Sequence, residues 1–305
     1  MQFHQLGYFV AVARARHFTR AAEETGTTQP NLSKQIRSLE NALGTQLFVR
    51  GPSGVELTSA GEALLPHAER ILIEVATAER SVHEVTSLRR GRVRVGATPS
   101  ICEGLLPAAL TAFHGQHPGI ELEVSEGSSG VLTRDLSEGR LDVALLIAPL
   151  RVAAPDLVST PVLRERLVLA SPADADVPDQ LRIADLQGRP LVMFREGYDL
   201  RDVTRRACSD HGFSPTVAIE GGEMGGVLRI VEAGLGSAVV PAMVIPSRPA
   251  LKASTLGGTQ GEPPLERTIA IVHRSQETLP LAVQSFVEEL TDHLRSTGSP
   301  DLRQV

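Results

Sequence analysis

Apolar side chains recur at helical spacing through the first 44 residues of the chain. Between residues 4 and 16 they follow the i, i+3, i+4, i+7 pattern of one helix face, at Leu6, Phe9, Val10 and Ala13. A second helix is expected to begin at a Thr19 cap and to end at Gly26. Its Ala21 and Ala22 are small enough to let another helix approach closely. A tight turn then leads to a third helix.

The stretch TTQPNLSKQIRSLENALG, residues 27–44, predicts this third helix and gives it two different faces. Thr28 is placed to cap the helix, Pro30 falls in the first turn, and Gly44 ends it. One buried stripe is formed by Leu32, Ile36, Leu39 and Leu43. The opposite face carries cations, amides and hydroxyls, at Gln29, Asn31, Ser33, Lys34, Gln35, Arg37 and Ser38. Such side chains suit phosphates and base edges, although a solvated surface helix is the alternative for this segment taken alone.

Two short alternating segments follow, LFVR (47–50) and VELT (55–58), around the turn GPSG. Alternation around Gly and Pro predicts a two-stranded wing. Two helices joined by a tight turn, with the polar face of the second turned outward, complete the pattern of a winged helix-turn-helix. In this arrangement the third helix enters the major groove of DNA and the wing reaches the flanking backbone.

A long helix with a heptad seam is predicted next. Ser59 and Glu62 have the spacing of a capping box. Apolar residues then alternate at spacings of four and three, at Leu64, Ala68, Ile71, Val75, Ala78, Val82 and Val85. This seam predicts pairing with a second copy of the helix, and a helix packed on its own domain is the alternative. Pro66 is expected to bend or locally break the first turns.

The remaining residues alternate between strand-like and helix-like segments, which predicts α/β layers around parallel sheets. The boundary of this part follows RRGR, at 89–92. A first series of segments ends near residue 160, a second series follows, and RTIAIVH with a helix near 279–296 returns to the first pattern. We therefore expect two subdomains joined by two crossovers, near 160 and 267.

Charge is distributed unevenly along the chain. The whole sequence carries 30 Lys and Arg against 36 Asp and Glu, a formal charge of −6. Residues 1–60 hold six basic and four acidic side chains and so carry +2, which leaves −8 for the rest. DNA binding by such a weakly basic domain is expected to depend on a dimer and on base contacts more than on bulk attraction.

Residues 1–61, with FTRAAEETGTTQPNLSKQIRSLENALGTQLFVR and VELTSAG, resemble the DNA-binding domain of the LysR-type transcriptional regulators. The phrase EAGLGSAVVP (232–241) is typical of that family's effector domain, so the resemblance covers the whole chain. It implies three parts: a winged helix-turn-helix domain at 1–58, a dimerisation linker helix at 59–89, and an effector domain at 90–305. The effector domain is expected to be similar to periplasmic solute-binding proteins, with two Rossmann-like subdomains at about 90–160 with 268–305 and at about 161–267.

The resemblance also implies partners and DNA contacts. It implies a sequence-specific regulator of transcription that binds double-stranded operator DNA as a dimer, with tetramers expected, and that responds to a small co-inducer. The residues carried over as DNA contacts are Thr28, Gln29, Pro30, Asn31, Ser33, Lys34, Arg37 and, in the wing, Arg50.

A ligand site is expected at the carboxyl ends of the strands, in the crevice between the two subdomains. Helix starts there attract anions. The candidate residues are Thr98, Pro99, Ser100, Ser128, Ser129, Ile147, Arg195, Glu196, Glu223 and Met224. The hydroxyls could orient a carboxylate and Arg195 could neutralise it, which predicts a small organic anion. Ordinary helix caps are the alternative for the hydroxyls, and a surface pair with Glu196 or Asp199 is the alternative for Arg195.

The sequence offers little support for other kinds of chemistry. Two cysteines, Cys102 and Cys208, are too few for a disulfide scaffold, and with no apolar leader or membrane-length run we expect a cytoplasmic protein. Some LysR-type proteins sense peroxide through a cysteine pair. Here Asp199 stands nine residues before Cys208, where the partner cysteine is expected, which argues against such a switch. His114 and His117 lack a third nearby ligand, so we expect no metal and no cofactor.

Two rival classes of function are weaker. A solute-binding transport component would explain the two-lobed body but has no use for residues 1–88. An enzyme needs a nucleophile, an acid and base pair or a cofactor loop in the cleft, and neither a Gly-x-Ser-x-Gly elbow nor a P-loop occurs. We therefore expect no catalytic residues.

Overall fold

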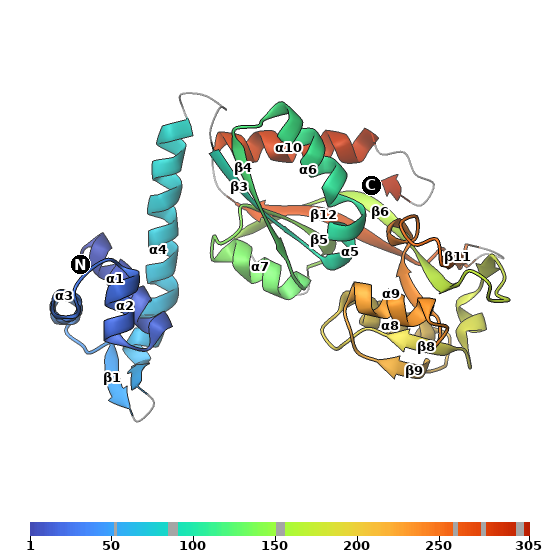
Figure 1. Ribbon diagram of the computed structural model, residues 1–305, viewed down its shortest axis with the longest axis horizontal. Helices are drawn as coiled ribbons and strands as arrows, with labels where there is room; N and C mark the ends of the chain where they lie inside the picture. The colour runs from blue at the N-terminus through green and yellow to red at the C-terminus, as the bar shows by residue number, and fades with distance from the viewer. Residues whose placement is uncertain (52–53, 85–90, 151–155, 259–261, 276–278, 297–301) are drawn as a thin grey trace. The chain divides into compact units, whose positions relative to one another are not determined.

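The computed structural model describes residues 1–305 except 52–53, 85–90, 151–155, 259–261, 276–278 and 297–301 (Figure 1). The chain divides into two compact units. The N-terminal unit is made almost entirely of residues 1–86, and the C-terminal unit is made of most of the residues that follow.

The N-terminal unit contains the three predicted helices and the wing. Its elements are α1 (Phe3–Ala15), α2 (Phe18–Glu24), α3 (Gln29–Leu43), β1 (Phe48–Gly51), β2 (Gly54–Leu57) and α4 (Ser59–Glu84). The strands pair in antiparallel register, with Phe48 opposite Leu57. The expected Thr19 cap is wrong, because α2 begins one residue earlier and the His17 ring accepts a hydrogen bond from the Thr19 amide, with 3.2 Å between nitrogens.

Helix α4 starts differently from the expected capping box. The Thr58 hydroxyl accepts a hydrogen bond from the Gly61 amide at 3.1 Å, so Thr58 rather than Ser59 caps the helix. Pro66 lies inside α4 without breaking it.

The residues of the predicted seam of α4 differ in burial along the helix. Ala68 is fully buried, and Leu64 and Ile71 pack against the core of the N-terminal unit. The alternative of a helix packed on its own domain is therefore correct for this first part. Val75 is half-buried and Ala78 exposed, and the side chains of Val82 and Val85 lie outside the described residues. Val75 lies outside the core cluster of this unit.

The C-terminal unit has two lobes, and the predicted series of strands and helices is confirmed. Lobe I contains β3 (Gly91–Ala97), α5 (Pro99–Gly104), α6 (Leu106–Gln116), β4 (Ile120–Glu126), α7 (Ser129–Ser137), β5 (Val143–Ala148), α10 (Leu281–Ser296) and β13 (Leu302–Gln304). Lobe II contains β7 (Gln180–Leu181), β8 (Pro190–Met193), α8 (Asp199–Asp210), β9 (Thr216–Glu220), α9 (Met224–Glu232), β10 (Ala238–Pro241) and β11 (Leu251–Leu256), with 3₁₀ turns at Ile183–Leu186 and Ala242–Val244.

Two long strands, β6 (Leu157–Pro172) and β12 (Glu266–Arg274), join the lobes. The strand order is β4-β3-β5-β12-β6-β11-β7, and β10 also pairs with β6. Strands β3, β4 and β5 are parallel, whereas β12 is antiparallel to both β5 and β6. The sheet is therefore mixed, not parallel throughout as the alternation predicted, because both crossovers re-enter it as strands.

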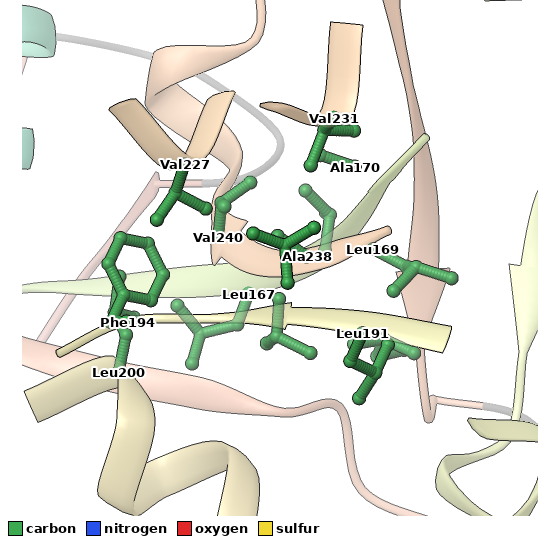
Figure 2. Close-up of a cluster of buried hydrophobic side chains, with 14 of the residues drawn as sticks. Leu167, Leu169, Ala170, Leu191, Phe194, Leu200, Val227, Val231, Ala238 and Val240 are labelled. Carbon is green, nitrogen blue, oxygen red and sulfur yellow. The ribbon is translucent and has the colours of Figure 1, made fainter. Parts of the chain in front are cut away.

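Each lobe is built around its own core. In lobe I, alternate residues of β5 point to opposite faces: Val143 and Leu145 pack under α6 and α10, and Ala144 and Leu146 pack under α7 (Figure 1). In lobe II, the second half of β6 packs with β8, β10 and the two helices, as Leu167, Phe194 and Val227 illustrate in Figure 2. These cores fix the strand ends from which the site residues project.

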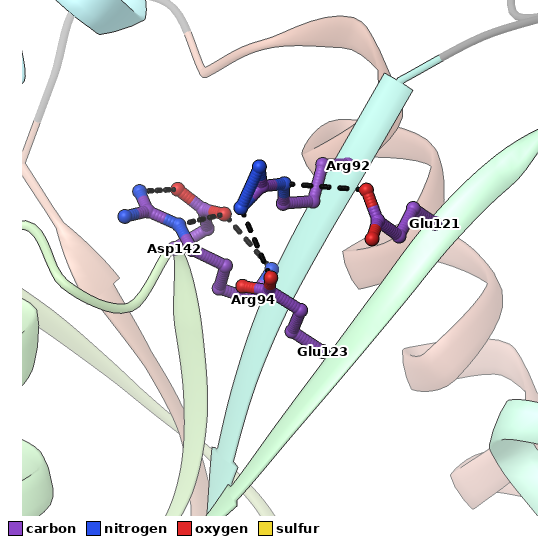
Figure 3. Close-up of polar contacts among 5 residues, drawn as sticks. All are labelled: Arg92, Arg94, Glu121, Glu123 and Asp142. Carbon is purple, nitrogen blue, oxygen red and sulfur yellow. Dashed lines mark hydrogen bonds and ion pairs between the residues drawn. The ribbon is translucent and has the colours of Figure 1, made fainter. Parts of the chain in front are cut away.

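A buried ion pair ties β5 to β3. The Asp142 carboxylate accepts hydrogen bonds from the Arg94 guanidinium at 2.6 and 3.0 Å and from the Arg94 amide at 2.9 Å (Figure 3). The side chain of Asp142 is 5% exposed and that of Arg94 is 17% exposed. Arg92, on the same strand, instead pairs with the exposed Glu121 and Glu123 of β4.

Replacing Asp142 by alanine is expected to lower the free energy of unfolding by about 3 kcal/mol, because the mostly buried Arg94 guanidinium loses its carboxylate. Chemical denaturation of the full chain measures the change. The control, Glu123→Ala, removes an exposed carboxylate and is expected to cost less than about 1 kcal/mol. Equal losses in the two variants would contradict the role given to burial.

Candidate nucleic-acid interface and ligand pocket

Helix α3 is held with one fixed face inward. Leu32, Ile36 and Leu39 are buried in the core of the N-terminal unit, as the spacing predicted. Pro30 lies in the first turn, and Gly44 ends the helix in the left-handed conformation, with φ 71°. Thr28 occupies the cap position, but its side chain makes no capping hydrogen bond. Its hydroxyl is therefore not committed to the helix.

The opposite face of α3 is open to solvent. Of the residues expected to contact DNA, five are exposed: Thr28, Pro30, Asn31, Lys34 and Arg37. Gln29 and Ser33 are half-buried, and the Gln29 amide donates to the Ser33 hydroxyl at 3.0 Å. The Arg37 Nε donates to the Ser33 carbonyl at 3.3 Å, which orients the guanidinium along the helix. The side chain of Arg50 lies outside the described residues.

A hollow of about 450 Å³ lies beside this face, between α3, α2 and the wing. Gln29, Ser33 and Arg37 form its polar side, and Phe18 and Val55 contribute apolar side chains to its floor. Gln46 also lines the hollow. The sequence did not single it out, because it lies in the connection after α3, where no periodic pattern applies.

A pocket lies between the lobes of the C-terminal unit. It holds about 20 Å³ of free space, which is room for about one water molecule. Six of the ten residues expected at a ligand site line it: Thr98, Pro99, Ser100, Ser128, Ser129 and Ile147. Lobe II and β12 add Gly197, Tyr198, Asp199, Leu200 and Arg267.

The Thr98 hydroxyl is an unsatisfied polar group of this pocket, and the Tyr198 hydroxyl is another. Thr98 directly follows β3 and occupies the cap position of α5, yet its side chain makes no capping hydrogen bond. The residue is 5% exposed, and its Oγ1 has no hydrogen-bond partner. A buried hydroxyl without a partner costs free energy, so a ligand that bonds to it gains what the empty pocket lacks.

A buried guanidinium lines the pocket from β12. Arg267 donates to the Glu165 carboxylate at 2.7 Å and to the Ser100 hydroxyl at 2.8 Å. Glu165 is fully buried on β6 and also accepts the Met243 amide at 3.3 Å. The positive charge of Arg267 is therefore matched within the fold. Sequence reasoning missed this residue because it lies inside a strand with no motif around it.

A hydrogen bond crosses the pocket from lobe to lobe. The Ser129 hydroxyl donates to the Asp199 carboxylate at 2.6 Å. Ser129 is the first residue of α7 and Asp199 is the first residue of α8. The carboxylate therefore lies at the amino-terminal ends of two helices, where a negative charge is stabilised.

Four of the expected ligand residues do not line this pocket, and Arg195 is the important one. Its guanidinium pairs with Glu223 at 3.0 Å and lies 5.7 Å from the centre of the Tyr198 ring. Arg195 therefore forms a surface ion pair, as the alternative predicted, but its partner is Glu223 and not Glu196 or Asp199. Met224 is buried in the lobe II core and Glu196 is exposed. The cation on which the anion prediction depended is therefore not in this pocket.

Acidic groups gather beside Tyr198. Burial raises the pKa of the Glu126 carboxyl, and the nearby charges of Glu223 and Glu103 raise it further. Burial also raises the pKa of Tyr198 to about 12.

No group of three described histidine, cysteine or acidic residues could hold a metal ion.

Comparison with known proteins decides the family. Residues 3–62 match "Bacterial regulatory helix-turn-helix protein, lysR family", and residues 86–295 match "LysR substrate binding domain". The chain belongs to the LysR family. The LysR regulator CfxR of Cupriavidus necator is 31% identical over 96% of this chain and 92% of its own. A hydrogen peroxide-inducible genes activator of Pectobacterium carotovorum is 30% identical over 97% of each chain.

A solved structure of full-length CbnR complexed with its target DNA has the same fold, with a TM-score of 0.71. It is 26% identical and covers 96% of this chain and all of its own. The present chain is thus a LysR-type DNA-binding transcriptional regulator with a two-lobed effector-binding domain of the periplasmic-binding-protein type. No described helix is long and apolar enough to span a membrane.

Both thiols of this LysR regulator resist ionisation. Burial raises the pKa of Cys102 to about 11, with further increments from Glu126 and Glu103. Burial raises the pKa of Cys208, which is fully buried. Both cysteines are free. Because the thiolate is the reactive form, neither site has the low pKa of a redox-sensing cysteine.

Replacing Thr98 by valine is expected to raise the free energy of unfolding by about 1 kcal/mol in the absence of ligand, because the buried unpartnered hydroxyl is removed with little change of shape. Chemical denaturation measures the change. Ser100→Ala is the control and is expected to lower the free energy of unfolding, because it removes a hydrogen-bond acceptor from the buried Arg267. A loss of stability in Thr98→Val would show that the hydroxyl is already satisfied.

Proposed function

We propose that this LysR regulator binds specific duplex DNA through α3 and that a small molecule in the pocket between lobes I and II controls this binding. The observation that carries the first part is the exposed polar face of α3 beside a wing, with Leu32, Ile36 and Leu39 fixed in the core behind it. The pocket with its unsatisfied Thr98 hydroxyl supports the second part.

The relatives support the same assignment. CbnR is described in complex with its target DNA, and the Pectobacterium relative is described as an activator of hydrogen peroxide-inducible genes. For the present chain we propose that α3 enters the major groove and that its amides, hydroxyls and cations read base edges and phosphates. With a charge of only +2 over residues 1–60, a dimer on two half-sites is needed for tight binding. We also propose that the protein works in the cytoplasm, where its DNA lies.

Arg37→Ala is expected to weaken binding to the preferred sequence by about 1 to 3 kcal/mol, because Arg37 is exposed on α3 and its Nε bond to Ser33 aims it along the groove-facing side. The preferred sequence is first selected from a random duplex library with the parent protein. Titration followed by gel shift then gives the affinities.

Arg70→Ala is the control for this experiment. Arg70 is an exposed arginine of the same unit on α4, so its removal changes the net charge equally without touching α3. Unchanged affinity in Arg37→Ala would reject the docking of α3. An equal loss in both variants would reduce the role of Arg37 to bulk charge. Selection of no sequence at all by the parent protein would reject the proposed function.

We further propose that the later part of α4 pairs with a second copy. Val75→Glu places a charge on a half-buried seam position outside the core cluster, so it is expected to dissociate the dimer while the unit stays folded. Sedimentation velocity measures the assembly state and circular dichroism measures the helix content.

Ile71→Glu is the matched comparison for Val75→Glu. Ile71 packs against the core of the N-terminal unit, so this change is expected to reduce thermal stability as well as assembly. A Val75→Glu protein that remains dimeric at the parent's dissociation constant would show that the seam does not form the interface.

A further inference from the structure

We propose that the Asp199 carboxylate is a built-in anion that fills the anion-binding position of the pocket, so that the pocket accepts an uncharged effector with a hydrogen-bonding group. The inference rests on the proposed function of the pocket and goes on to name the chemical class of its ligand. It reverses the expectation of an organic anion.

The position of Asp199 is the first reason. Its carboxylate lies 2.6 Å from the hydroxyl of Ser129, a residue that is itself only 5% exposed. These two residues begin helices of 12 and nine residues that approach from different lobes. The amino-terminal ends of α7 and α8 therefore already stabilise a negative charge, and that charge belongs to the protein.

The state of the guanidinium in the pocket wall is the second reason. An incoming carboxylate binds most strongly where it meets a cation. Arg267 is only 6% exposed and is held by the buried Glu165 and by Ser100. A carboxylate effector would place a second negative charge beside a guanidinium that Glu165 already neutralises, whereas an uncharged molecule leaves the balance of charge unchanged.

The Thr98 hydroxyl is the third reason, and it points to a ligand independently of the helix ends. It is buried, lines the pocket and has no partner, so a ligand group that donates to it or accepts from it removes an existing cost. The neighbouring wall is apolar, from Pro99, Ile147 and Leu200. An amide or alcohol with a small apolar body would bond to the Thr98 hydroxyl and pack against this apolar wall.

The Ser129–Asp199 bond spans a pocket with little free space. With the bond made, the space holds about 20 Å³, so a ligand larger than water requires the lobes to move apart at this point. The same carboxylate that excludes anions therefore holds the pocket shut in the absence of ligand. Removing it vacates a space of the size and polarity of a small carboxylate.

Chemical rescue of Asp199→Ala tests the built-in anion directly. The full-length variant is expected to unfold roughly 2 to 6 °C below the parent, because a charge-assisted hydrogen bond between the lobes is lost. Sodium acetate is expected to restore at least part of this loss by occupying the vacated position. Sodium chloride at the same ionic strength and acetamide at the same concentration are expected to restore none.

The control for this rescue is Asp210→Ala, which removes the exposed carboxylate at the other end of the same helix. Neither it nor the parent is expected to respond specifically to acetate. If acetate fails to stabilise Asp199→Ala beyond chloride, or stabilises all three proteins equally, the built-in anion is rejected.

A second variant, Asp199→Asn, keeps the acceptor for Ser129 and serves if the alanine variant does not fold. Calorimetry with the matched pair benzamide and benzoate is expected to show a preference for the amide in the parent. In Asp199→Asn the preference is expected to shift toward benzoate by about tenfold. Tighter binding of benzoate than benzamide by the parent, an unchanged preference, or no binding of either compound to either protein would overturn the proposed ligand class.

The two proposals fail separately. Rescue by acetate with no DNA sequence selected would reject the regulatory function and leave the role of Asp199 standing. Selected DNA binding without rescue or amide preference would reject the role of Asp199 and leave the regulator standing.

Discussion

The pairing of β6 with β12 is the constraint on which the C-terminal unit depends. Both strands run through the join between the lobes, and β6 continues into lobe II to pair with β10 and β11. The buried pair of Glu165 and Arg267 sits on these two strands, and each member also reaches one lobe, through Met243 and Ser100. Because a buried charge without its partner costs several kcal/mol, the pair fixes the strands and one wall of the pocket together. The strands that join the lobes therefore also form one wall of the pocket.

The spacing of apolar residues was sufficient to predict the helices and the wing, but it did not predict which side chains cap the helices. The helices at 3–15 and 29–43 and the wing follow from apolar spacing, because burial on one face imposes that spacing. Caps were harder: His17 and Thr58 replace the expected Thr19 and Ser59, because a cap depends on the local turn and on which side chain reaches a free amide. The short strands β7 and β11 carried no strong pattern; β11 forms along the edge of β6, and β7 then pairs with β11.

In the pocket, too, the positions that follow from the sequence pattern were predictable and the contacts between distant segments were not. Residues at strand ends, such as Thr98 and Ser129, were predictable because carboxyl ends of strands meet at one edge of a sheet. The cation was not predictable. Arg195 lies in a polar loop and looked available, but the fold pairs it with Glu223, whereas Arg267 is brought to the pocket from inside a strand. Which arginine lines the pocket depends on which carboxylates the fold brings close to each guanidinium. These carboxylates come from segments far apart in the sequence, so the sequence alone does not show the pairing.

The pocket's polar groups suggest how a ligand could act on the lobes. A ligand shifts a conformational equilibrium only by interacting differently with the two states. In the described state the Ser129–Asp199 bond is made and the Thr98 hydroxyl is unsatisfied. A ligand that separates the lobes at Asp199 loses the charge-assisted bond from Ser129 and gains a bond with Thr98, which offsets part of that loss. The apolar contacts with Ile147 and Leu200 then decide the balance, which makes the shape of the ligand's apolar body the main determinant of response.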